Sequence, residues 1–83
     1  MKILKLEKQG CAPCKMVQGY LEANAGDVEV EVVDAFENPD VAAKYEISSV
    51  PVTILLDSTG DEVSRSIGFN PDELDELIDL ASK

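Results

Sequence analysis

A helix pattern stands between two strand patterns in the first half of the chain, and this order limits the folds that are open to it. Residues 2–6 (KILKL) are mainly apolar, as in a buried strand, and residues 28–33 (VEVEVV) alternate between valine and glutamate. From Cys14 to Gly26 the apolar positions step by three and four, which is typical of a helix. Strands joined through a helix lie parallel in one sheet, so we expect an α/β fold.

The second half of the chain adds two helix starts and a strand hairpin. Asn-Pro-Asp occurs at 38–40 and again at 70–72, where Asn suits a helix cap and Pro the first helical turn. Between them, residues 51–57 and 61–68 are strand-like and are joined by a turn at 58–60. The predicted order is β-α-β-α-β-β-α, a four-stranded mixed sheet with helices on both faces. Because the glutamates of VEVEVV would face water, we expect this strand at or near the edge of the sheet.

Composition narrows the class of protein further. Eighty-three residues with 45% hydrophobic side chains suit a single domain, residues 1–83, with its own core. A net charge of −10 argues against nucleic acid and anionic membranes as partners. No apolar run approaches the roughly 20 residues that a membrane span needs, and residues 1–10 lack the apolar core of a signal peptide. We therefore expect a monomer in the cytoplasm.

The charge is distributed unevenly along the chain. Residues 1–15 carry four lysines and one glutamate, a local charge of +3 against −10 for the whole chain. An acidic surface that keeps a small protein soluble is one interpretation. The other is that the neighbourhood of the cysteines is kept electropositive, and the sequence leaves both open.

Both cysteines of the chain lie in the segment GCAPCK, residues 10–15. As a structural staple the pair would close a span of only four residues, which constrains an unfolded chain too little to add much stability. Zinc usually takes four cysteine or histidine ligands, and this chain has two cysteines and no histidine. We predict no metal site, with a metal shared by two copies of the chain as the alternative. A CxxC in a reducing compartment is more often catalytic or metal-binding than structural.

Thiol–disulfide exchange needs an attacking thiolate and a second thiol that resolves the mixed disulfide. Cys11 lies just before a predicted helix, where free amide N–H groups favour negative charge, and Lys8 and Lys15 add to this. Cys11 is therefore the predicted nucleophile, with its pKa below the free value of about 8.5. Cys14, about one turn into the helix, is the predicted resolving thiol. Pro13 fits the first helical turn.

Three segments of the chain resemble the thioredoxin family, in its short, glutaredoxin-sized form. CAPCKM (11–16) is similar to the family's Cys-Gly-Pro-Cys-Lys-Met signature. VVDAFENPDVAAKYEISSVPVTILL (32–56) resembles the thioredoxin segment that leads to a cis-proline, and STGDEVSRSIG (58–68) resembles its final hairpin. The resemblance implies a thioredoxin-like fold and a protein-disulfide reductase that works through a Cys11/Cys14 dithiol–disulfide couple, with no bound cofactor.

The resemblance also implies which residues surround the cysteines and bind the substrate. It implies a cis Val50-Pro51 bond that faces them, with the Val50 backbone free to pair with a substrate strand, and Gly68 leaving room for that substrate. Pro51 has the alternative of an ordinary strand-start proline. The loop residues of the implied active site are Gly10, Ala12, Pro13 and Lys15.

The chain departs from the family pattern at several of these positions. Gly10 stands where thioredoxins usually have Trp, and Ala12 replaces a Gly, which should alter the redox potential. Lys5 aligns with a usually buried Asp that assists proton transfer, so Cys14 would have to use water, Lys5 or Glu7 instead. Together with Lys8, these side chains are the candidates for modulating the thiol pKa values. Lys5 either snorkels to the end of the sheet or lies near Cys14.

The resemblance further implies partners. Electrons would come from NADPH through a flavoprotein thioredoxin reductase and pass to protein disulfides, or to an enzyme such as ribonucleotide reductase, in cell redox homeostasis. A glutathione-coupled, glutaredoxin-like reductase is the enzymatic alternative, with Asp72 near its ligand site. A thioredoxin-like module that only binds a partner is the alternative from another class.

Overall fold

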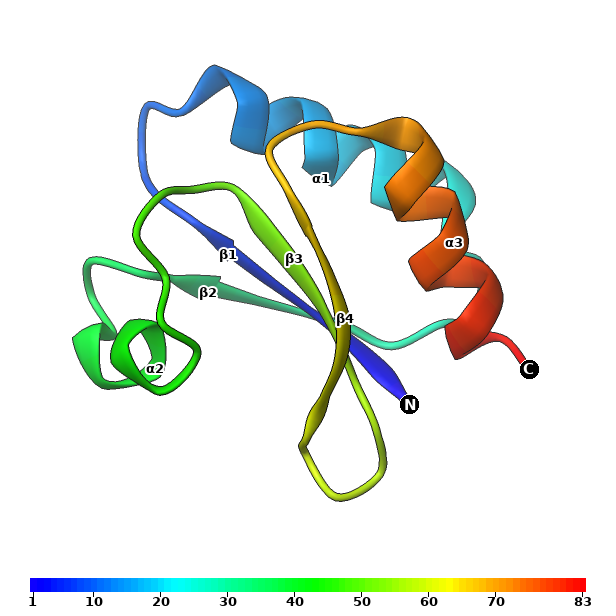
Figure 1. The fold of residues 1–83 in the computed structure, drawn as a ribbon. Helices are drawn as coiled ribbons and strands as arrows, with labels where there is room; N and C mark the ends of the chain where they lie inside the picture. The colour runs from blue at the N-terminus through cyan, green and yellow to red at the C-terminus, as the bar shows by residue number, and fades with distance from the viewer.

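A four-stranded sheet lies between two helical layers (Figure 1). The computed structural model describes all of residues 1–83. Its strands are β1 (Lys2–Glu7), β2 (Val30–Asp34), β3 (Val52–Leu56) and β4 (Glu62–Ile67), and its helices are α1 (Ala12–Asn24), α2 (Pro39–Lys44) and α3 (Pro71–Ala81). The strand order is β2-β1-β3-β4, in which β1 and β2 run parallel and the other pairs antiparallel. The predicted element order and mixed sheet are confirmed, and β2 is an edge strand as expected.

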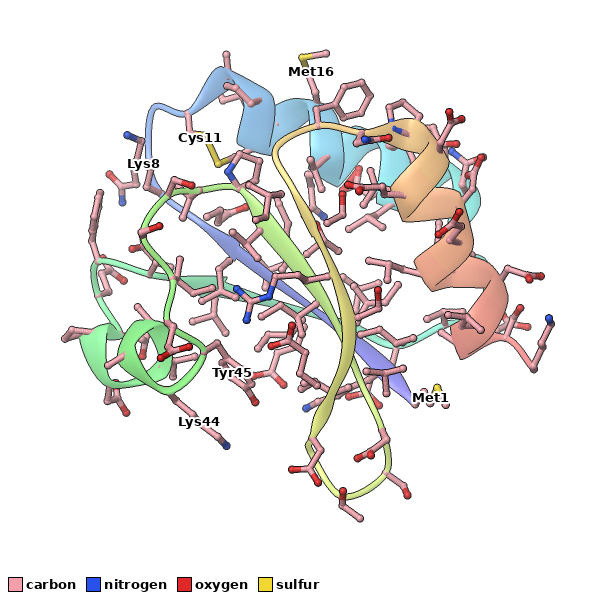
Figure 2. The ribbon with its side chains drawn as sticks, in the orientation of Figure 1. Met1, Lys8, Cys11, Met16, Lys44 and Tyr45 are labelled. Atoms are coloured by element: carbon pink, nitrogen blue, oxygen red, sulfur yellow. A yellow bond between two sulfur atoms is a disulfide. The ribbon has the colours of Figure 1, made fainter.

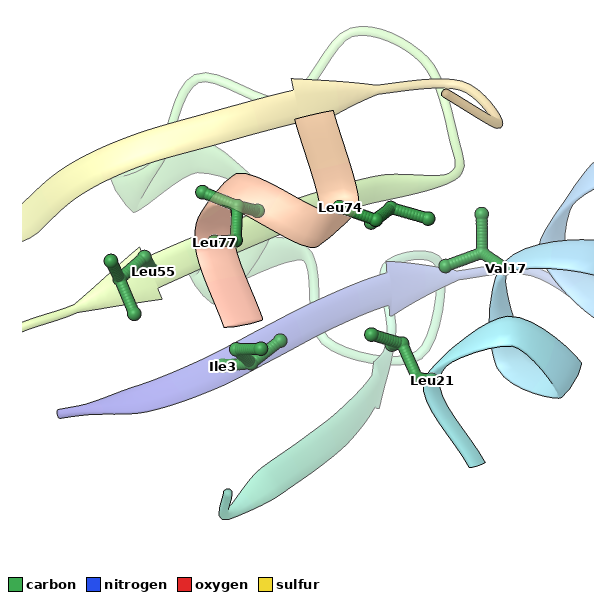
Figure 3. Packing of buried hydrophobic residues seen from close by; sticks show 6 residues of the cluster. All are labelled: Ile3, Val17, Leu21, Leu55, Leu74 and Leu77. Atoms are coloured by element: carbon green, nitrogen blue, oxygen red, sulfur yellow. The ribbon is translucent and has the colours of Figure 1, made fainter. Parts of the chain in front are cut away.

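The sheet buries hydrophobic side chains on both faces. Towards α1 and α3 the core consists of six residues, shown in Figure 3: Ile3, Val17, Leu21, Leu55, Leu74 and Leu77. Towards α2 a second cluster holds Leu4, Leu6, Ala35, Val52, Ile54 and Leu56. Burying one such aliphatic side chain contributes about 1.5–3 kcal/mol, so these clusters fix the sheet that carries the site. No helix is both long and apolar enough to cross a bilayer.

Local differences from the sequence prediction have simple causes. Helix α1 begins at Ala12 with Cys11 as its N-cap, as expected for Cys11, although the helical periodicity of the sequence becomes visible only from Cys14. Strand β2 begins only at Val30, and Val32 on this edge strand is 44% exposed although its alternation placed it inward.

Of the two expected asparagine caps, only one is made. Asn70 caps α3 by accepting a hydrogen bond from the Glu73 N–H at 3.2 Å. The expected cap at the start of α2 is not made, since the Asn38 side chain donates to the Asp34 carbonyl instead.

A row of buried polar side chains crosses the helix α1 and α3 face of the sheet. Lys5 is paired with Thr53 across β1 and β3, and Thr53 is paired with Ser66 across β3 and β4. All three residues are fully buried. The Ser66 hydroxyl donates to the Glu73 carboxylate at 2.9 Å, whereas Thr53 Oγ1 has no hydrogen-bond partner. The middle of the row is therefore a buried, unsatisfied hydroxyl.

Replacing Thr53 by valine is expected to raise the free energy of unfolding by about 1 kcal/mol, because a buried hydroxyl without a partner keeps its full desolvation cost. Valine keeps the β-branched shape. Urea denaturation followed by circular dichroism measures the change. Ser66→Ala is the matched control, and it should lower stability because it removes a hydrogen bond to Glu73. A lower stability of Thr53→Val would contradict this account.

Candidate active site at the start of helix α1

Cys11 and Cys14 form a disulfide at the amino end of α1, with 5.2 Å between their Cα atoms. Cys11 is the N-cap residue, with φ −103° and ψ 107°, and its Sγ accepts a hydrogen bond from the Cys14 N–H at 3.2 Å. Gly10 precedes it at φ +69°, in the left-handed region that favours glycine, and turns the chain from β1 into the helix. A sulfur that accepts a helix-terminal N–H is placed where a thiolate is stabilised.

The two cysteines are buried, while the residues beside them in the loop are exposed. Cys14 is 2% exposed and Cys11 is 6% exposed, so Cys14 is the more shielded sulfur, as predicted, by a small margin. The flanking residues Ala12, Pro13 and Lys15 are exposed. Pro13 lies in the first turn of α1, where its missing N–H removes no helical hydrogen bond. The rim of the site is thus open while the sulfur atoms are largely covered.

The segment before β3 lies at the same end of the sheet as the disulfide (Figure 1). The Val50-Pro51 bond is cis, which confirms the expectation from the resemblance. Leu6 pairs with Val52, so Pro51 neighbours the carboxyl end of β1, from which the loop to Cys11 departs. No hydrogen bond uses the N–H or carbonyl of Val50, and both groups are therefore free to pair with another chain.

Gly68 is tied to the same segment. Its N–H donates to the Pro51 carbonyl at 2.9 Å, and its φ of +76° lies in the left-handed region. A Cβ at Gly68 would meet no atom of this chain within 4 Å, so the surrounding space is open. The structure thus brings Val50, Pro51 and Gly68 together, and glycine is required there by backbone conformation.

Lys5 is buried beneath α1. Its side chain is 0% exposed, and Nζ donates to Glu7 Oε1 at 2.5 Å and to Gln18 Oε1 at 3.1 Å. The snorkelling alternative is wrong, because a snorkelling ammonium would reach water. Gln18 follows Cys14 by one helical turn and shares its side of the helix, so Lys5 lies under the first turns of α1. Sequence reasoning missed Gln18, which its i+4 spacing from Cys14 could have indicated.

Lys8 and Lys15 take part in none of the ion pairs of the structure. Lys8 lies near Cys11 in Figure 2, and its Nζ is 5.9 Å from the centre of the Phe36 ring. Phe36 is 73% exposed. Sequence reasoning missed this aromatic residue, although a phenylalanine directly before the polar residues Glu37 and Asn38 was a signal.

The aromatic residues Tyr20, Tyr45 and Phe69 pack against the two hydrophobic clusters. Tyr20 and Phe69 pack edge to face, with 6.1 Å between ring centres, and both lie against the core under α1 and α3. Tyr45 packs against the core cluster on the α2 side. No cluster of three or more His, Cys, Asp or Glu side chains is arranged to hold a metal ion.

Comparison with known proteins decides the family. The family model described as Thioredoxin matches residues 3–80, nearly the whole chain. The chain belongs to the thioredoxin family. It is 51% identical over 78 residues to the SPbeta prophage-derived thioredoxin-like protein YosR of Bacillus subtilis, covering 94% of this chain and 95% of that protein. It is also 38% identical to the thioredoxin of Staphylococcus epidermidis, covering 95% and 80% of the two chains.

Solved thioredoxin structures share the fold. The chain superposes on the thioredoxin NaTrxh of Nicotiana alata with a TM-score of 0.84 and 30% identity, covering 95% of this chain and 70% of that one. Mitochondrial thioredoxin 3 of Saccharomyces cerevisiae, in its oxidised form, gives a TM-score of 0.79 at 30% identity, covering 93% and 74%. With its CAPC disulfide at the start of α1, this thioredoxin-family chain is a thioredoxin-type thiol–disulfide oxidoreductase.

Proposed function

We propose that this thioredoxin-family protein works in the reducing direction and transfers electrons from a flavoprotein thioredoxin reductase to disulfides of other proteins in the cytoplasm. The observation that carries the proposal is the Cys11–Cys14 disulfide at the amino end of α1, where Cys11 Sγ accepts the Cys14 N–H. The same position would stabilise a Cys11 thiolate once the disulfide is reduced.

The reaction balances as two exchanges. The Cys11 thiolate attacks one sulfur of the substrate disulfide, forms a mixed disulfide, and releases the first substrate thiolate. Cys14 then loses its proton and attacks Cys11 Sγ, which forms the Cys11–Cys14 disulfide and releases the second substrate thiolate. Two electrons pass to the substrate, and its two thiolates take up protons. The structure corresponds to the oxidised state that ends this cycle.

The residues around the cysteines would place the substrate. The unpaired N–H and carbonyl of Val50 offer an edge to an extended substrate segment, next to the cis Pro51. The open space beside Gly68 leaves room for that segment. The exposed loop residues Ala12 and Lys15 would form the rim over which the substrate disulfide reaches Cys11.

Three charged residues would modulate the thiols. The Lys5 ammonium is buried under the first turns of α1 and is held by Glu7 and Gln18. A buried positive charge there would favour a thiolate at Cys14 in the resolving step, and the part-exposed Glu7 carboxylate offers a route for its proton to water. Lys8, which has no ion-pair partner, would favour the attacking thiolate from the loop side.

The electron donor, the oligomeric state and the electron acceptors form a separate part of the proposal. We propose NADPH and a thioredoxin reductase as the source, a monomer as the working form, and protein disulfides or an enzyme such as ribonucleotide reductase as the acceptors. The thioredoxin names of the Staphylococcus relatives support this choice over glutathione.

Insulin reduction tests the proposal with two donor systems in parallel. One assay supplies NADPH and a thioredoxin reductase, and the other supplies NADPH, glutathione and glutathione reductase. NADPH consumption above the protein-free control is expected with the first system only. Turnover with glutathione alone would replace the proposal by a glutaredoxin-like reductase, with residues 68–72 as its ligand region. No turnover with either system would contradict the proposed donor and substrate class.

A further inference from the structure

Strand β2 leaves one edge of the sheet open. It is the outermost strand in the order β2-β1-β3-β4, with β1 as its only neighbour (Figure 1). The Ala35 N–H donates to the Glu7 carbonyl at 2.9 Å, and with the parallel register this bond turns the odd-numbered residues of β2 towards β1. The N–H and carbonyl groups of Val30 and Val32 therefore point away from β1, and no turn or loop supplies a hydrogen bond to them.

The two faces of β2 carry different side chains along this open edge. Val30 packs against the core under α1 and α3, and alternation places Val32 on the same face. Val33 packs against the cluster on the α2 side, so Glu29 and Glu31 lie on that face. Val32 is 44% exposed, so the valine row of the strand extends beyond what this chain itself covers.

The opposite edge of the sheet is less open to a further strand. Strand β4 pairs with β3 with a register irregularity at Leu55 and Leu56, and irregularities of this kind impede the pairing of another strand. The Arg65 guanidinium on β4 also binds the Glu62 carboxylate and donates to the Tyr45 carbonyl at 2.9 Å. In contrast, all five residues of β2 pair with β1 in one continuous register. The β2 edge is therefore the better template for an added strand.

Charge decides which kind of strand this edge admits. Residues 16–43, which contain β2 and its flanks, carry seven Asp or Glu and neither Lys nor Arg. Lys2 pairs with Glu31 at 2.7 Å, whereas Glu29 takes part in no ion pair. A second copy of the chain, with its net charge of −10, would be repelled at this acidic edge. A strand with Lys or Arg on the face of the glutamates would be attracted instead.

We propose that the β2 edge docks an extended segment of a partner protein in which Lys or Arg alternates with valine-like side chains. The segment pairs with the free backbone groups of Val30 and Val32. Its basic side chains lie beside Glu29 and Glu31, and its apolar side chains cover Val32. Because β1 separates β2 from β3, the docked segment leaves the disulfide and the cis-proline segment accessible. The edge thus holds a basic partner at a place separate from the exchange reaction, and the inference does not depend on the proposed electron donor.

NMR titration of the oxidised protein with two peptides tests the proposal. One peptide, Thr-Val-Lys-Val-Lys-Val-Thr with blocked ends, has the basic alternation, and the other has glutamate in place of both lysines. We expect the lysine peptide to bind at least about tenfold more tightly, because its charge contacts with the glutamates of β2 are attractive rather than repulsive. Added salt should narrow this difference. The largest amide shifts should fall on Val30 and Val32, and hydrogen exchange of these two amides should slow.

The Val32→Pro variant tests the backbone pairing directly. It removes an N–H that points away from β1, and proline at such an edge-strand position leaves the ladder within the sheet intact. The variant should fold, as circular dichroism will show, and should bind the lysine peptide at least about tenfold more weakly. Val32→Thr is the matched control, since it keeps the N–H and the β-branched shape, and its affinity should stay within about threefold of the wild-type value.

Three results would each overturn the inference: equal affinity for the two peptides, amide shifts centred outside residues 29–34, or undiminished binding by Val32→Pro. Self-association of the protein through β2 would also overturn it. If Val32→Pro does not fold, the position of the amide shifts in the unsubstituted protein decides. None of these results bears on the proposed reductase, because the peptides contain no cysteine and the protein is held in its oxidised state.

Discussion

Replacing Cys11 by serine is expected to abolish insulin reduction, with a loss of roughly a thousandfold or more, because a hydroxyl cannot form the mixed disulfide. The fold should survive, since the change removes a cross-link that spans only residues 11–14. Turnover with NADPH and thioredoxin reductase measures the loss, and circular dichroism checks the fold. A variant that kept more than a small fraction of the wild-type rate would contradict the assignment of Cys11 as nucleophile.

Cys14→Ser is the matched control, because it changes the second sulfur and leaves the first. The Cys11 thiolate of this variant can still attack, but no thiol remains to resolve the mixed disulfide. It should therefore react once and accumulate as a covalent adduct with the substrate, which intact-mass spectrometry detects. An adduct on Cys14 in the Cys11→Ser variant, and none on Cys11 in the Cys14→Ser variant, would reverse the two roles.

The second large effect is expected from Glu7→Gln, which removes the carboxylate that faces the buried Lys5 ammonium. Breaking a fully buried ion pair typically costs 3–5 kcal/mol, roughly, because the remaining charge is left without its partner. Glu7 is 33% exposed, so we expect a smaller loss of about 2 kcal/mol in the free energy of unfolding. Urea denaturation measures it. An unchanged stability would show that Gln18 and water suffice for Lys5.

Lys5→Met is the matched control and also tests the proposed role of the charge. It removes the buried ammonium and keeps an unbranched side chain of similar length, so stability should change by less than about 1 kcal/mol. If Lys5 acts only in packing, the pH dependence of Cys14 alkylation, followed in the Cys11→Ser background, will not move. If its charge favours the thiolate, the midpoint pH of alkylation will rise in Lys5→Met. An unmoved midpoint would overturn the role proposed for Lys5.

The fold could be predicted from the sequence where the hydrophobic periodicity of a segment agreed with the capping and turn residues at its ends. Residues 2–6 became part of β1, and the two Asn-Pro-Asp segments became the starts of α2 and α3. The predicted burial of Val32 was wrong, because strict alternation does not show whether a helix covers that part of an edge strand. The position of Cys11 just before α1 was predicted, but its capping role was not, because a cysteine is not a usual N-cap residue and its sulfur performs the role here.

The candidate site was only partly predictable. The cysteines, the cis Val50-Pro51 bond and Gly68 follow from spacing and from the family resemblance, and the structure shows their geometry. Phe36 was missed because exposure is a tertiary property, and an aromatic residue in a turn can equally be part of a core. The contact between Lys5 and Gln18 was missed because it joins a strand and a helix whose relative rotation the sequence does not specify.

The central claim is that Cys11 and Cys14 form a reversible redox couple, and its equilibrium potential tests this most directly. The protein is equilibrated in thiol–disulfide buffers of known potential, quenched with an alkylating agent, and weighed by mass spectrometry. We predict one two-electron transition between the values of thioredoxin, about −270 mV, and protein disulfide isomerase, about −180 mV. A disulfide that stays intact to potentials below about −300 mV would be a structural bridge, and that result would contradict the account.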